Sequence, residues 1–104
     1  MTLKEKLGEL TDSLVTVAHC APDDYDEWYL EFFPTQEAIH EERIKDLREL
    51  WSEIRPKIKK NLVKADYVGI KLQGMMDAFN RGDKVEGKKI ARELADLYDI
   101  TKLK

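Results

Sequence analysis

The stretch that decides the fold runs from residue 44 to residue 79 and reads IKDLRELWSEIRPKIKKNLVKADYVGIKLQGMMDAF. Apolar or small side chains recur in it at steps of three or four residues. They are Ile44, Leu47, Trp51, Ile54, Ile58, Leu62, Ala65, Gly69, Leu72, Met76 and Phe79. This is the period of an α-helix that buries one stripe, and a β-strand cannot keep it. The pattern predicts that the other helices pack against this stripe.

Pro56 interrupts the helical pattern inside this stretch. Proline lacks a backbone N–H, clashes with the preceding turn and disfavours helical geometry at the residue before it. Two interpretations are open: a true break with Pro56 at the first position of a new helix, or one long helix that is kinked there. An unbroken helix from Thr35 to Asn80 would be about 69 Å long and would almost require a dimer. We favour the break, because a proline inside a helix costs about 3 kcal/mol.

The rest of the chain is rich in helix-forming residues and divides at its few prolines and glycines. Capping residues stand before three of the segments, at Thr2, Thr35 and Asp83, and Gly82 supplies a turn before the last of them. We therefore predict an all-α fold in one domain over residues 1–104. It is a small bundle of three to four main helices plus one short aromatic helix, at about 2–20, 24–33, 35–55, 57–80 and 83–99, followed by a short tail.

Charge is distributed in blocks along the chain. The net charge is −3, which gives no general reason to expect nucleic acid or an anionic membrane. From Asp23 to Glu53 there are eleven acidic and three basic residues, whereas from Arg55 to Lys71 there are six basic residues and one acidic residue. These blocks can attract each other within the fold or across a dimer. A narrow apolar seam in the first helix (Leu3, Leu7, Leu10, Leu14, Val17) also favours a homodimer.

Cys20 is the only cysteine, so a disulfide framework is excluded, as is typical of a reducing cytosol. The first residues are charged within four positions and do not resemble a signal peptide. No apolar run approaches the ~20 residues that a membrane span needs. We expect a cytoplasmic protein that does not contact the membrane.

Five of the nine aromatic residues lie between Pro22 and Pro34. We expect them on one face of a short helix, with acidic residues filling the rest. This face can cover the open end of the bundle, or it can offer anchors to a protein partner, because Trp and Tyr are enriched at interface hot spots. The expected binding surface consists of Tyr25, Trp28, Tyr29, Phe32 and Phe33.

Glu37 and His40 have a Glu-x-x-His spacing that continues the buried stripe towards the start of its helix. Di-iron carboxylate proteins hold metal with such pairs projecting into a bundle, but they carry the motif twice. A divalent transition metal or Mg²⁺ would here be held by Glu37, His40, Glu41 and His19. We prefer a simpler interpretation. The negative charge of Glu37 stabilises the positive N-terminus of the helix, and His40 lies at the edge of the core with its hydrogen bonds satisfied.

In an antiparallel four-helix bundle, one pole of the molecule would also gather the soft side chains. Such ligands suit zinc, copper or iron, although a lone cysteine and methionines more simply fill the core. The residues of this pole are His19, Cys20, Glu37, His40, Met75, Met76, Phe79 and Asp83.

Two acidic spacings, Glu41-Glu42 and Glu93-x-x-Asp96, resemble the magnesium-binding helices of all-α nucleotide pyrophosphatases. The resemblance implies hydrolysis of nucleotide phosphates. The family pattern also has a glutamate three residues after the Glu-Glu pair, and this chain has Lys45 there.

A basic patch is expected at Arg55, Lys57, Lys60 and Lys64, and its three lysines, together with Lys71, are expected on one side of the helix that follows Pro56. Because nucleic-acid modules usually carry a net positive charge, an acidic protein or the acidic half of a second copy fits this patch better. The preferred function is a small cytosolic interaction or regulatory protein without catalysis or cofactor. The alternative is a metal-binding helical protein or metal-dependent enzyme.

Overall fold

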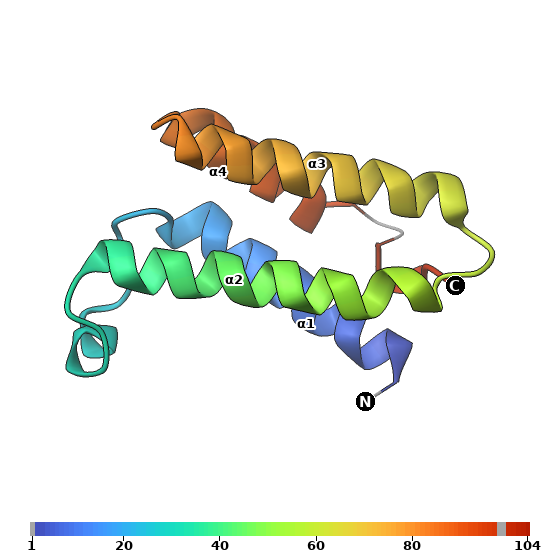
Figure 1. Cartoon of the computed structure of the whole chain (residues 1–104), viewed down its shortest axis with the longest axis horizontal. Coiled ribbons are helices and arrows are strands. Elements are labelled where there is room, and N and C mark those ends of the chain that lie inside the picture. Colours follow the sequence, from blue (N-terminus) through green and yellow to red (C-terminus); the bar gives the residue numbers. More distant parts are fainter. Residues whose placement is uncertain (1, 98–99) are drawn as a thin grey trace.

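The computed structural model describes residues 2–97 and 100–104, and every regular element within them is helical (Figure 1). Successive α-helices alternate in direction, and three short 3-10 helices lie between or after them. The predicted all-α fold is confirmed, and the pairing of two chains stays a prediction. The α-helices are α1 (Leu3–Cys20), α2 (Gln36–Ile54), α3 (Leu62–Asn80) and α4 (Lys84–Ala95), and the 3-10 helices are η1 (Glu27–Glu31), η2 (Arg55–Lys57) and η3 (Ile100–Lys102).

Helix α4 packs against both α1 and α3, and α1 also packs against α2. The resulting bundle measures 41 × 28 × 20 Å. The predicted seam of α1 is confirmed, because four of its five apolar residues are fully buried and Leu3 is partly buried. Among the described residues, no charged side chain is buried, so apolar contact dominates the core.

The three predicted caps are all present. The side chains of Thr2, Thr35 and Asp83 each accept a hydrogen bond from the backbone N–H three residues further on, at 3.1–3.2 Å. Gly82 has a φ of +84°, the left-handed conformation that the turn before α4 requires. Each cap is worth about 1 kcal/mol, and together they fix where three of the four α-helices start.

The favoured break between two helices is confirmed, but Pro56 does not begin the second one, because Arg55 keeps helical geometry and η2 follows α2 directly. Helix α2 ends at Ile54, Pro56 lies within η2, and Ile58 is extended. The helix that we expected to start at residue 57 starts at Leu62 instead. Leu62, predicted to lie on the buried stripe, is consequently 46% exposed.

Backbone hydrogen bonds explain the late start of α3. The N–H groups of Lys59, Lys60 and Asn61 donate to the carbonyl oxygen of Lys104, at 3.0, 2.7 and 3.1 Å. The Asn61 N–H therefore bonds a distant segment rather than the Lys57 carbonyl oxygen, which it would bond in a helix that started at residue 57. Further along α3, the small Gly69 allows a close helix contact: a Cβ on Gly69 would lie 3.3 Å from Nε1 of Trp51 in α2.

The end of the chain differs from prediction. Helix α4 ends at Ala95 rather than near residue 99, and residues 98 and 99 lie outside the described residues. The expected tail is instead a 3-10 turn that packs on α1, with Ile100 and Leu103 only 1% and 4% exposed. Five residues are too few to give a periodic signal, so the sequence offered no sign of this burial.

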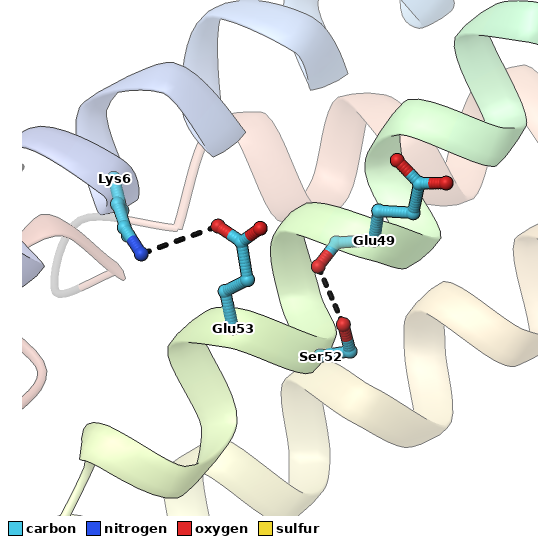
Figure 2. A network of polar contacts seen from close by, with 4 residues as sticks. All are labelled: Lys6, Glu49, Ser52 and Glu53. Carbon is cyan, nitrogen blue, oxygen red and sulfur yellow. Dashed lines mark hydrogen bonds and ion pairs between the residues drawn. The ribbon is translucent and has the colours of Figure 1, made fainter.

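On the surface, the ammonium of Lys6 in α1 pairs with Glu53 of α2 at 3.2 Å (Figure 2). In the same region the Ser52 hydroxyl donates to the Glu49 carbonyl oxygen at 2.6 Å. An exposed ion pair contributes ~0–1 kcal/mol, so this contact adds little to what the core provides. No helix within the described part of the chain is long and apolar enough to span a membrane.

Candidate functional site: an aromatic platform with acidic surroundings

The aromatic segment forms a 3-10 turn rather than the predicted helix over 24–33. Only Glu27–Glu31 are helical, and the N–H groups of Tyr29 and Phe32 bond carbonyl oxygens three residues back, at 3.1 and 3.0 Å. Tyr25 precedes this turn and is 3% exposed. Its predicted place on the binding surface is therefore wrong: Tyr25 belongs to the core, because it stands outside the turn that orients the other aromatic residues.

Gln36, in the first turn of α2, ties the segment down. Its side-chain oxygen accepts from the Tyr25 N–H at 2.8 Å, and its amide nitrogen donates to the Tyr25 carbonyl oxygen at 3.0 Å. One side chain thereby satisfies both backbone groups of a residue whose ring is buried. Such paired bonds position the loop firmly, since leaving a buried donor unsatisfied would cost ~1–3 kcal/mol.

Above this anchor, Trp28, Tyr29 and Phe32 form what we term the aromatic platform. The rings of Trp28 and Tyr29 stack at 3.9 Å with 24° between their planes, and Phe32 meets Trp28 edge-on at 6.3 Å. Trp28 is 54% exposed and Phe32 is 70% exposed. Tyr29 and the predicted Phe33 are half-buried, and both pack against the core. The platform is thus a preformed apolar surface that the bundle does not cover.

Carboxylates dominate the sequence around the platform. Between residues 21 and 42 there are eight Asp and Glu residues and no Lys or Arg, and all eight are exposed. Burial first, and then the charges of Asp26 and Asp24, raise the pKa of the Cys20 thiol, which keeps it protonated at neutral pH. A cation is also present: a guanidinium nitrogen of Arg43 in α2 lies 3.5 Å from the Tyr29 hydroxyl. The exposed carboxylates outnumber it, so the field around the platform favours a positively charged partner.

His40 lies beneath the segment and contacts two core rings. Its Nδ1 is 3.3 Å from the Tyr25 hydroxyl, and its ring meets that of Phe79 at 4.8 Å and 69°. Burial lowers the pKa of His40, while Glu41 and Glu37 oppose that shift. Burial also raises the pKa of Tyr25, so its hydroxyl remains a donor at neutral pH.

The residues of the metal alternative are not brought together as a ligand set. Glu37 and Glu41 are exposed, and Nδ1 of His19 is 2.9 Å from the Val15 carbonyl oxygen within α1. Within residues 2–97 and 100–104, no three His, Cys, Asp or Glu side chains could hold one metal ion. The metal alternative rests on sequence spacing alone.

The other residues of the predicted pole have structural partners. Met75 and Met76 are buried in the core, and Asp83 caps α4. The acidic pairs of the pyrophosphatase resemblance lie on different helices, α2 and α4, and Glu93 pairs with Lys71 at 3.5 Å.

The predicted basic patch does not lie on one side of one helix. Arg55 and Lys57 belong to η2, Lys60 belongs to the connection, and only Lys64 belongs to α3. Arg55 is bound to Asp66 at 2.9 Å. The prediction was wrong because it started this helix at residue 57, whereas α3 starts at Leu62 and residues 57–61 lie outside it.

Sequence reasoning missed a second apolar surface, on the outer side of α3. Val63, Tyr67 and Ile70 are 84%, 48% and 73% exposed. Their spacing of four and three residues was itself a signal, because it forms a second apolar stripe beside the buried one.

Comparison with protein-family models, curated proteins and solved structures found no match to this chain.

Proposed function

We propose that this chain is a small helical interaction protein that binds a basic, apolar protein segment on its aromatic platform. The observation that carries the proposal is the exposure of Trp28 and Phe32 on a turn that Gln36 anchors. A preformed aromatic surface loses little conformational entropy on binding, and such residues often supply most of the binding energy. The single free cysteine fits a reducing compartment.

The charge around the platform defines the partner class. Eight exposed carboxylates lie between residues 21 and 42, and they outnumber the guanidinium of Arg43 that contacts Tyr29, so Lys and Arg on the partner would be steered towards the platform. Apolar or aromatic side chains on the partner would then cover the Trp28 and Phe32 rings. No catalytic step is part of this proposal.

Peptide display on the immobilised, folded chain tests the proposal. Selected peptides should combine Lys or Arg with Trp, Phe or Leu. They should bind the Trp28→Ala, Phe32→Ala double variant at least about 30-fold more weakly, equivalent to the ~2 kcal/mol of a hot spot. Val85→Ala is the matched control, because Val85 is 74% exposed on α4, and it should bind as the wild type does.

Circular dichroism must show that the double variant keeps its helical content. Selection of acidic peptides, or equal binding to the wild type and a folded double variant, would overturn the proposal.

A further inference from the structure

A hollow beside the start of α3 is complementary to the aromatic platform: it is apolar and lies next to basic side chains. It has a volume of about 260 Å³, and its lining is apolar apart from one lysine. The lining residues are Val63, Lys64, Tyr67, Leu97 and Leu103. A larger hollow of about 670 Å³ shares Lys64 and Leu103 with it, and among the described residues Lys4 and Lys104 also line this larger hollow. An apolar recess next to a basic surface suits an acidic, aromatic ligand.

We propose that this hollow receives the aromatic platform of a second copy of the chain, and that two copies dock reciprocally as a closed dimer. The inference rests on the proposed function, because the same platform does the docking. Charge complementarity selects the occupant: the platform lies in a stretch with eight carboxylates, and the connection beside the hollow carries exposed Lys57, Lys59 and Lys60. Burial of Trp28 and Phe32 would supply the free energy, and the opposite charges would orient the two copies.

The position of the two surfaces makes the reciprocal arrangement possible. Figure 1 shows η1 at one end of the long axis, and the start of α3 and the C-terminal segment at the other end. The molecule is 41 Å long, so in two copies lying side by side in opposite directions the end of each that carries the platform lies beside the end of the other that carries the hollow. A twofold axis then relates two identical contacts.

Closure favours this dimer over an open chain of copies. Once one platform has docked, the second contact forms within the same complex and pays no further translational or rotational entropy. The dimer hides both platforms. An external partner therefore competes with the second copy, and its apparent affinity falls as the chain becomes more concentrated.

Reversed charges on two exposed side chains test the proposal. Phe32→Lys places a cation close to the exposed lysines of the connection beside the hollow, and Val63→Glu places an anion against the acidic stretch that carries the platform. Phe32 and Val63 are 70% and 84% exposed, so neither change disturbs the core. Sedimentation velocity should show a dimer for the wild type and for the matched control Val85→Glu. Each test variant alone should dimerise at least about tenfold more weakly.

Mixing the two variants distinguishes reciprocal docking from other dimers. The mixed pair has one unaltered contact and one Lys–Glu contact, so native mass spectrometry should show a heterodimer in preference to either homodimer. The proposal is overturned by a wild type that stays monomeric up to about 1 mM. It is also overturned if either variant dimerises as the wild type does, or if mixing yields no heterodimer. A monomeric wild type that still selects basic peptides through Trp28 would leave the proposed function standing.

Discussion

Two short 3-10 segments, η1 and η3, differ in whether their apolar side chains are buried. Residues Glu27–Glu31 bury none of their side chains, although they stand in the most aromatic part of the chain. By contrast, η3 and the residue after it bury Ile100 and Leu103 almost completely against the bundle. The sequence pattern suggested the opposite, because it predicted an aromatic helix within the fold and only a short tail at the end. Apolar content alone therefore does not decide which short segment completes a core.

The difference follows from what each segment can bond. The end of the chain supplies the Lys104 carbonyl oxygen, on which three backbone N–H groups converge, and this places Leu103 inside the fold. The aromatic segment is anchored at Tyr25 by Gln36, upstream of the turn, which leaves the rings beyond it on the surface. The first segment thus serves stability, and the second is available for binding.

The largest expected effect on stability comes from truncating one apolar side chain in each of the two segments. Ile100→Ala removes a side chain that is 1% exposed and leaves a cavity, so it should destabilise the fold by about 2–5 kcal/mol. Trp28→Ala removes a larger side chain that is 54% exposed and should cost less than about 1 kcal/mol. Urea denaturation followed by circular dichroism measures both values. Equal losses of stability would show that η1 belongs to the core as much as η3 does.

A smaller effect should separate the two anchors. Gln36→Ala leaves both backbone groups of Tyr25 without partners and should cost about 1–3 kcal/mol. Asn61→Ala removes one exposed bond, from the Lys104 N–H to Oδ1 at 2.9 Å, and should cost about 0.5–1 kcal/mol.

Tryptophan fluorescence gives a second comparison of the anchors. In a Trp51→Phe background, where Trp28 is the one remaining tryptophan, Gln36→Ala should change the emission of the folded state, whereas Asn61→Ala should not. A Gln36 variant with unaltered stability and emission would mean that the turn holds the platform without this anchor.

Much of the fold follows from local sequence signals. The caps at Thr2, Thr35 and Asp83, the seam of α1 and the break at Pro56 each depend on residues close together in the chain, and all were predicted. The late start of α3 depends on Lys104, more than forty residues away, and could not be read from local pattern.

The candidate site was predictable to a similar extent. Trp28 and Phe32 were identified from composition, but the inward place of Tyr25 depends on Gln36, eleven residues further on. The hollow on α3 combines Val63 with Leu97 and Leu103, which only the folded chain brings together.

The smallest expected effect is a pH dependence of stability that comes from His40, which lies beneath the aromatic segment. Burial lowers the pKa of His40 in the folded state, whereas an unfolded histidine titrates near 6.5. The unfolded chain therefore binds more protons, so the contribution of His40 to stability is fully present above pH ~6.5 and declines as the pH falls through that value. Urea midpoints between about pH 7.5 and 5.5 should show this decline in the wild type and in the control His19→Gln, but not in His40→Gln. If His40→Gln shows the same decline as the wild type, other groups cause it, and the Tyr25–His40–Phe79 cluster does not respond to pH.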